Sequence, residues 1–427
     1  MRRLMVEIVV FLMLSLFGCS TEESPLTQGR WEGIVRLAGQ PVFIYIDRQG
    51  AQWTAAFPEL MISQVQLHDV KAKGEKFSFS VWLGNEDLLA EFQWNGSFFV
   101  GKTLFQNISE KAELHKGRYS LAYREKIRSK REGVAVSVST VHGELKGTLL
   151  LPKGEGPFPC ILLIPGSGPT DRDGNSEIMV GSNDMLLQLA LYLQSIGFAS
   201  LRYDKQGVGE SRTQDPPPFG YDFQDSVDDA ITWIQFLNLR TDLNGIGLVG
   251  HSEGSLIALA SAQQVNVDFI VSLAGNGDSI DLQLMKQIGR LSQETALVLK
   301  QQLERLKNDL EVTLSGNLLV DSLLPPENLC YLRSWMEYDP VEIIASLSSP
   351  LLIVWGTADE RITEEDNILL YQGNPAATYL VVEGMGHLLK QSNTPESIQQ
   401  TYSNPKLTLD STMLAGLSNF LLSYKGL

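Results

Sequence analysis

The sequence predicts an α/β protein in which a doubly wound, mostly parallel sheet with a helical insertion follows a small antiparallel all-β domain. From about residue 133 to the end, short apolar runs alternate with helical patterns, which is typical of a parallel sheet covered by helices. Before residue 123, apolar and polar residues alternate with period two between glycines, as in antiparallel strands. A charged run over 124–132 separates these regions and predicts a linker.

Length and composition agree with two globular domains. The chain has 427 residues, of which 43% are apolar, and this exceeds one ordinary domain. Its formal net charge of -16 repels nucleic acid and offers no basic patch to anionic lipids, so we expect no nucleic-acid partner. Of three cysteines, we expect Cys160 and Cys330 to be buried thiols rather than a disulfide. The oligomeric state cannot be derived from these features.

The first 18 residues have the order of a signal peptide. Arg2 and Arg3 precede an apolar run from Ile8 to Phe17, which is too short to span a bilayer comfortably. The segment Leu16-Phe17-Gly18-Cys19 resembles a bacterial lipoprotein box, in which Cys19 carries a lipid and becomes the new N-terminus. An ordinary secretory signal is the alternative, because the residue before Gly18 is larger than usual. We expect an exported protein of the cell envelope that is held at a membrane only through that lipid.

Residues 19–123 form the predicted β-rich domain. The segment Phe77–Leu83 alternates between apolar and polar residues, which marks a half-buried strand. Aromatic residues at alternate strand positions indicate packing rather than ligand binding. We expect a sandwich or a small barrel. The strands expected are Trp31–Leu37, Val42–Asp47, Phe77–Leu83, Leu88–Trp94 and Phe98–Leu104.

Residues 133–427 form the predicted second domain. Short apolar runs bounded by turn residues predict buried strands, and longer periodic segments predict helices. Residues 280–347 interrupt this rhythm with helix-forming sequence, and we expect them to form a cap over the functional site. The strands expected are Val134–Thr140, Leu145–Leu151, Cys160–Ile164, Ala199–Tyr203, Ile246–Val249, Phe269–Leu273, Leu351–Trp355 and Thr378–Val382. The helices expected are Ile178–Ile196, Asp225–Leu237 and Met413–Leu422.

The stretch from Gly247 to Ala258 predicts a nucleophile. It places Ser252 in the pattern Gly-x-Ser-x-Gly between an apolar run and a helical run, which gives a strand, a tight turn and a helix. Gly250 and Gly254 leave room for that turn. The helix directs free N–H groups at an oxyanion beside the serine, and the backbone N–H of Glu253 is one expected donor. Because the motif alone arises often by chance, its context carries the prediction.

A serine nucleophile needs a base, and His387 is the one histidine of five that follows Ser252. It ends the segment Glu383-Gly384-Met385-Gly386-His387, a glycine loop after a predicted strand that we expect to be flexible. The imidazole needs a carboxylate that fixes its tautomer. Asp359, just past a buried strand, is favoured because one large fold of serine hydrolases has the chain order Ser, Asp, His. Asp278, after the preceding strand, is the alternative.

Three segments together resemble the α/β-hydrolases. They are Leu163–Asn175, Arg202–Ser211 and Gly250–Gly254. More narrowly, residues from about 133 to 427 resemble the EstD-type bacterial carboxylesterases, which are related to the serine-aminopeptidase-like hydrolases and carry a β-rich domain before the catalytic one. The resemblance implies the α/β-hydrolase fold and the hydrolysis of carboxylic esters. It also implies a second oxyanion donor, the backbone N–H of Ser167, with that of Gly168 as the alternative.

Two details of the first segment need comment. Pro165-Gly166 stands where many relatives have His-Gly, but the expected donor is a backbone N–H and does not depend on that side chain. Asp171-Arg172-Asp173 resembles an acidic metal loop, although its glycine spacing is wrong for calcium. We expect charge pairs that stabilise the turn, and neither a metal ion nor another cofactor.

The predicted activity is acyl transfer from a small-molecule ester to water. The acyl-enzyme would form on Ser252, with His387 as the base and Asp359 as its partner. Two alternatives stay open. The same residues can cleave amides, as in a serine peptidase of the aminopeptidase type. A non-catalytic, surface-binding lipoprotein on a hydrolase fold would be favoured by the loss of one of the three residues, and none is missing.

Overall fold

The computed structural model describes residues 29–37, 40–49, 52–57, 62–83, 87–105, 107–116, 133–176, 182–212 and 220–424. The chain forms two compact units, the first ending at Gly117 and the second beginning at Arg118. The predicted signal peptide, Cys19 and the predicted linker 124–132 lie outside the described residues. Within the described ranges, no helix has the length and apolar character needed to cross a bilayer.

The first unit is one nine-stranded antiparallel sheet with the strand order β4-β3-β2-β1-β9-β8-β7-β6-β5. Trp53 of β3 packs on Phe77 of β6 with 5.2 Å between ring centres, although these strands lie near opposite edges, so the sheet curls upon itself. This is the barrel-like alternative, because a sandwich would need two sheets. The strands are β1 (Gly29–Leu37), β2 (Gln40–Gln49), β3 (Gln52–Phe57), β4 (Ile62–Gln66), β5 (His68–Lys73), β6 (Lys76–Trp82), β7 (Asp87–Trp94), β8 (Phe99–Phe105) and β9 (Ile108–Lys116).

The core of this unit lies on the concave face of the sheet. Strand β7 alternates between exposed and buried residues, which is the period expected of a strand with one solvated face. Trp31 and Phe99 are buried and meet edge to face, with ring centres 5.1 Å apart. Trp82 departs from the expected packing role, because it points outward and is 39% exposed.

The second unit contains an eight-stranded sheet with the order β10-β11-β13-β12-β14-β15-β16-β17. The first two strands pair antiparallel and the other six run parallel, as predicted. The central strands are buried on both faces, because helices cover each side. The strands are β10 (Val134–Thr140), β11 (Gly143–Leu150), β12 (Phe158–Ile164), β13 (Ala199–Tyr203), β14 (Leu243–His251), β15 (Phe269–Leu273), β16 (Leu351–Gly356) and β17 (Thr378–Val382).

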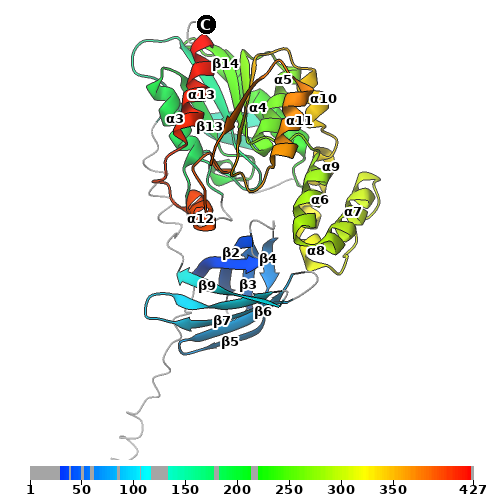
Figure 1. Cartoon of the computed structure of the whole chain (residues 1–427). Helices are drawn as coiled ribbons and strands as arrows, with labels where there is room; N and C mark the ends of the chain where they lie inside the picture. Colours follow the sequence, from blue (N-terminus) through cyan, green and yellow to red (C-terminus); the bar gives the residue numbers. More distant parts are fainter. Residues whose placement is uncertain are drawn as a thin grey trace, which may run out of the picture. The chain divides into compact units, whose positions relative to one another are not determined.

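Two layers of helices enclose this sheet, as Figure 1 shows. One layer holds α3 (Met185–Ser195) and α13 (Ser411–Leu421). The other holds α4 (Phe223–Asn238), α5 (Glu253–Gln264), α10 (Pro340–Ala345) and α11 (Glu364–Gly373). Helix α12 (Pro395–Ser403) precedes α13. Helix α3 begins at Met185, where the Asn183 side chain accepts the Met185 N–H and Asp184 adopts a left-handed conformation. The predicted start at Ile178 lies outside the described residues.

The inserted segment between β15 and β16 is helical. Helices α6 (Ile280–Leu291), α7 (Gln293–Lys307) and α8 (Leu318–Leu323) form a lobe that projects from the sheet (Figure 1). Helix α9 (Leu329–Trp335) joins this lobe to the rest of the unit by packing on α4 and α7. Cys330 on α9 is only half-buried, whereas Cys160 on β12 is buried as predicted, and both thiols are free.

Candidate active site

Ser252 occupies a strained turn between β14 and α5. Its backbone has φ 54° and ψ −119°, a conformation that residues with side chains rarely adopt. The turn depends on two glycines. A Cβ on Gly250 would lie 2.0 Å from the carbonyl oxygen of Gly254, and one on Gly254 would lie 2.4 Å from that of Ile164. The side chain of Ser252 is partly exposed, so its hydroxyl is accessible where the predicted nucleophile should be.

His387 and Asp359 form a buried pair. The Nδ1 atom of His387 lies 3.0 and 3.1 Å from the two carboxylate oxygens of Asp359. The side chains are 6% and 1% exposed, respectively. Because a carboxylate oxygen accepts, Nδ1 carries the proton, and Nε2 is left free to accept one. The N–H groups of Arg361 and Ile362 donate to the same carboxylate and fix its orientation.

The loop that carries His387 is closed by backbone hydrogen bonds, and one of its glycines packs against a side chain. The Gly386 N–H donates to Lys390 O and the Ser392 N–H donates to Gly384 O, both at 2.9 Å. A Cβ on Gly386 would lie 2.1 Å from the Ser392 hydroxyl. The glycines therefore allow close packing rather than motion.

Asp278 lies apart from His387. Its carboxylate pairs with Lys286 of α6, and the same ammonium group reaches Asp366 at the start of α11. Asp278 therefore links the inserted helices to the helical layer. Of the two predicted acids, the structure brings only Asp359 against the imidazole of His387.

The loop after β12 approaches the serine turn closely. A Cβ on Gly166 would lie 3.4 Å from the Cβ of Ser252. Within the described ranges, the backbone N–H groups of Ser167, Gly168 and Glu253 make no hydrogen bond. The first turn of α5 leaves its N–H groups without helical partners, which accounts for Glu253. The two predicted oxyanion donors, the backbone N–H groups of Glu253 and Ser167, are therefore available to bind a negatively charged oxygen.

His251, beside the serine, spans two parts of the site. Its Nε2 donates to the backbone carbonyl of His387 at 2.8 Å, and its Nδ1 would lie 3.1 Å from a Cβ on Gly166. Burial lowers the pKa of His251 to about 3, so its ring is neutral at ordinary pH. No hydrogen bond joins the Ser252 hydroxyl to the His387 ring in the described part of the chain, and such bonds often form only when substrate binds.

Sequence reasoning missed two side chains around Glu253. Its carboxylate accepts hydrogen bonds from the Lys205 ammonium group at 2.7 Å and from the Tyr331 hydroxyl of α9 at 2.9 Å. Burial and the neighbouring carboxylate raise the pKa of Tyr331 well above its usual value, so its hydroxyl remains a donor. Lys205 follows β13 in a segment that the resemblance included. No pattern pointed to Tyr331, whose role depends on tertiary packing.

Buried charge pairs stabilise the loop after β12, as predicted for Asp171-Arg172-Asp173. Arg172 donates to Asp204 at 2.6 Å and to Thr148 at 3.1 Å. Burial alone would raise the pKa of Asp204, but hydrogen bonding and the charge of Arg172 hold it below its usual value. Asp173 pairs with Arg202 of β13. Across the described ranges, no group of three or more His, Cys, Asp or Glu side chains is arranged to hold a metal ion.

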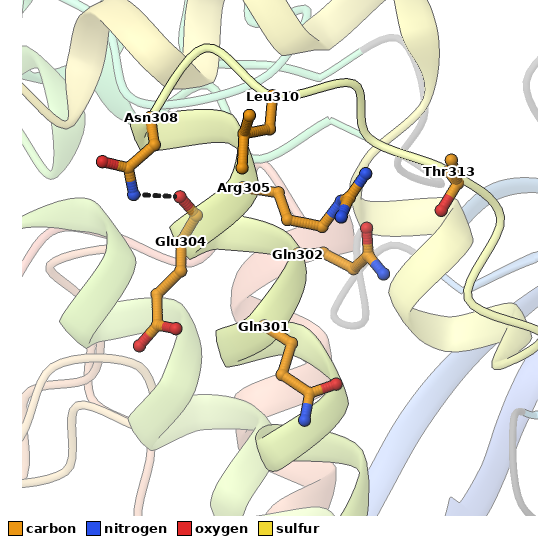
Figure 2. Close-up of a pocket in the computed structure, with 7 residues that line it drawn as sticks. All are labelled: Gln301, Gln302, Glu304, Arg305, Asn308, Leu310 and Thr313. Atoms are coloured by element: carbon orange, nitrogen blue, oxygen red, sulfur yellow. Dashed lines mark hydrogen bonds between the residues drawn. The ribbon is translucent and has the colours of Figure 1, made fainter.

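A separate hollow lies on the inserted helices. Its volume is about 440 Å³. It lies at the C-terminal half of α7 and the following segment, as Figure 2 shows. The Asn308 side chain donates to the backbone oxygen of Glu304 at 2.7 Å beside it. None of its lining residues belongs to the serine turn or to the His387 loop. The lining residues are Gln301, Gln302, Glu304, Arg305, Asn308, Leu310 and Thr313.

Comparison with known proteins places these features in context. The sequence model of a family described as "Alpha/beta hydrolase family" matches residues 161–392, which is more than half of the chain. Esterase EstD of Thermotoga maritima is 28% identical over 253 residues, which are 58% of this chain and 59% of that protein. The chain therefore covers less than two thirds of that relative's own length.

Two solved structures are similar to part of the chain at low identity. Est1E from Butyrivibrio proteoclasticus is 15% identical with a TM-score of 0.42, and the match covers 68% of this chain and 98% of that one. The alpha/beta hydrolase GrgF from Penicillium sp. sh18 is 17% identical with a TM-score of 0.45, over 69% and 99% of the two chains.

Proposed function

The chain belongs to the alpha/beta hydrolase family, and from that premise we propose that it is a serine esterase that cleaves small-molecule carboxylic esters. Ser252 is the proposed nucleophile, His387 the base and Asp359 the partner of that base. The observation that carries the proposal is the buried His387–Asp359 pair, which leaves Nε2 of the imidazole as a proton acceptor. His387 is also joined to the strained serine turn, because its backbone carbonyl accepts from His251. The similarity to an esterase supports the choice of ester over other substrates.

The proposed reaction has two halves. Nε2 of His387 takes the Ser252 proton as Oγ attacks the ester carbonyl, and the imidazolium then protonates the departing alcohol. In the second half, His387 takes a proton from water, the resulting hydroxide attacks the acyl-enzyme, and the proton returns to Oγ as the acid leaves. The N–H groups of Glu253 and Ser167 hold the oxyanion in both tetrahedral intermediates. Asp359 keeps Nδ1 protonated throughout.

A panel of chromogenic esters and aminoacyl amides tests this proposal on the soluble chain from Ser20 onward. We expect turnover of esters, and a drop of about three orders of magnitude or more in Ser252→Ala and in His387→Ala. The double variant should lose no more than either single variant, because the residues act together. Faster turnover of aminoacyl amides than of esters would instead indicate a peptidase. Near-normal ester turnover in folded His387→Ala would contradict the assignment of the base.

We also propose that Cys19 carries a lipid that holds the protein at a membrane of the cell envelope. The support is the sequence pattern around Gly18-Cys19. In a bacterial host, the full chain should label with a fatty-acid probe and sediment with membranes, whereas Cys19→Ala should not label. Equal labelling of both chains would contradict lipidation at this residue.

A further inference from the structure

Lys205 bonds to two residues of the proposed oxyanion site. One is Glu253, which supplies a donor N–H, and the other is Gly166, whose carbonyl shares a peptide group with the Ser167 N–H. The Nζ atom of Lys205 donates to Oε1 of Glu253 at 2.7 Å and to the backbone carbonyl of Gly166 at 3.3 Å. The Gly166 carbonyl and the Ser167 N–H belong to the same planar peptide group. One ammonium group is therefore bonded to the peptide that presents the Ser167 donor and to the side chain of Glu253, whose N–H is the other donor.

These two contacts have different physical effects. A donor on a carbonyl oxygen fixes the plane of the peptide and polarises it, which makes the N–H at the other end a stronger hydrogen-bond donor. The Glu253 carboxylate is only 2% exposed, and its charge would oppose the charge of an oxyanion formed beside it. The ammonium group of Lys205 offsets that charge.

We propose that Lys205 is a positioning residue for the oxyanion site. It orients and polarises the Gly166–Ser167 peptide and neutralises Glu253, so that the tetrahedral intermediate is stabilised more than the bound ester. This inference rests on the esterase activity proposed above. Lys205 need not touch the substrate, because it acts through Ser167 and Glu253.

Lys205→Met tests the inference by removing the ammonium group while keeping much of the side-chain length. We expect kcat for an ester to fall by about tenfold or more with KM nearly unchanged, since removal of a direct oxyanion donor costs about 10²–10³ in kcat and this contact is indirect. Affinity for a trifluoromethyl ketone, which forms an oxyanion when Ser252 adds to it, should fall in parallel. Affinity for an unreactive ether analogue of the substrate should not change. Lys300→Met, at an exposed lysine of α7, is the matched control and should retain wild-type kinetics.

The double variant Lys205→Met with Glu253→Gln separates the two effects. It leaves no unpaired carboxylate, so it also remains informative if Lys205→Met alone does not fold. We expect kcat to stay about tenfold below wild type, because the donor to Gly166 is still missing. Recovery of wild-type kcat would show that Lys205 only neutralises Glu253, and would overturn its role on the peptide.

Failure of this inference can be told apart from failure of the esterase proposal. If the wild-type chain hydrolyses no ester and Ser252 does not react with a fluorophosphonate, both proposals are wrong. If the wild-type chain is active and Lys205→Met has the same kcat and the same affinity for the trifluoromethyl ketone, only the role of Lys205 is wrong. A parallel loss of affinity for the ether analogue would indicate a general distortion of the pocket and would also overturn it.

Discussion

The buried carboxylate of Asp229 on α4 should destabilise the folded protein at neutral and higher pH. The residue is 6% exposed, and within the described ranges its carboxylate accepts no hydrogen bond. Burial raises its pKa from 3.8 to about 7, and the charges of Asp225 and Asp228 add to the effect while Lys205 opposes it. We therefore expect Asp229→Asn, which has nearly the same shape and no charge, to be more stable than the wild type at high pH.

The magnitude follows from the difference between the folded and unfolded pKa values. Each tenfold change in a proton affinity corresponds to about 1.36 kcal/mol, so the rise from 3.8 to about 7 corresponds to about 4 kcal/mol. Between these two values, the unfolded chain has lost the proton and the folded chain keeps it, so stability falls as pH rises through the window. Above about pH 8 the penalty is complete, and at pH 5 it is below about 2 kcal/mol.

Urea unfolding at pH 5 and pH 8 measures this difference. We expect Asp229→Asn to exceed the wild type in unfolding free energy by about 2–4 kcal/mol at pH 8 and by clearly less at pH 5. Glu311→Gln, which also removes the charge of a carboxylate but at an exposed position that does not act on Asp229, is the control and should alter stability by less than about 0.5 kcal/mol at both pH values. Equal effects of Asp229→Asn at the two pH values, or a loss of stability at pH 8, would refute the reasoning.

Three further predictions concern the site. Asp359→Asn should lower ester turnover by about four orders of magnitude, by analogy with the serine-protease variant that is the standard example of a wrong histidine tautomer. Asp278→Asn should retain turnover within about threefold. If the two variants rank in the opposite order on one ester, Asp278 and not Asp359 is the partner of His387. Because the pKa of His251 is about 3, His251→Gln should leave the acid limb of the kcat–pH profile where it is, and a displaced limb would show that His251 titrates there. Gly254→Ala should destabilise the protein by about 1–3 kcal/mol, because its Cβ would meet the Ile164 carbonyl oxygen at 2.4 Å, and an unchanged melting temperature would contradict that clash.

Short apolar strands and the serine turn could be predicted because their signals are local. Phe269–Leu273 and Thr378–Val382 match β15 and β17 at both ends, since each is a short apolar run between turn residues. The turn at Ser252 follows from two glycines at fixed spacing. In the first unit, alternation identified strands such as β7 but missed β9, because charged residues on both of its faces, Glu110, Lys111 and Glu113, interrupt the apolar pattern.

The contacts that complete the site could not be predicted, because they join distant segments. Lys205 and Tyr331 reach Glu253 from positions 48 and 78 residues away, and nothing in their own neighbourhoods indicates this. The close packing of the His387 loop has the same origin. Glycines in sequence suggest flexibility, but whether a glycine gives freedom or close packing depends on what lies against it. At Gly386 the neighbour is the Ser392 side chain.

Two adjacent residues after β13 act on the same loop in different ways. Asp204 accepts from the Arg172 guanidinium and from the Arg172 N–H at 2.9 Å, which fixes the far part of the loop after β12. Lys205 bonds to Gly166 in its near part. Buried ion pairs add little net stability, because desolvation cancels much of their attraction, but removing one partner of a pair is strongly destabilising. The end of strand β13 therefore bonds to both parts of this loop, and the proposed orientation of the Ser167 N–H gives the charges buried there a common role.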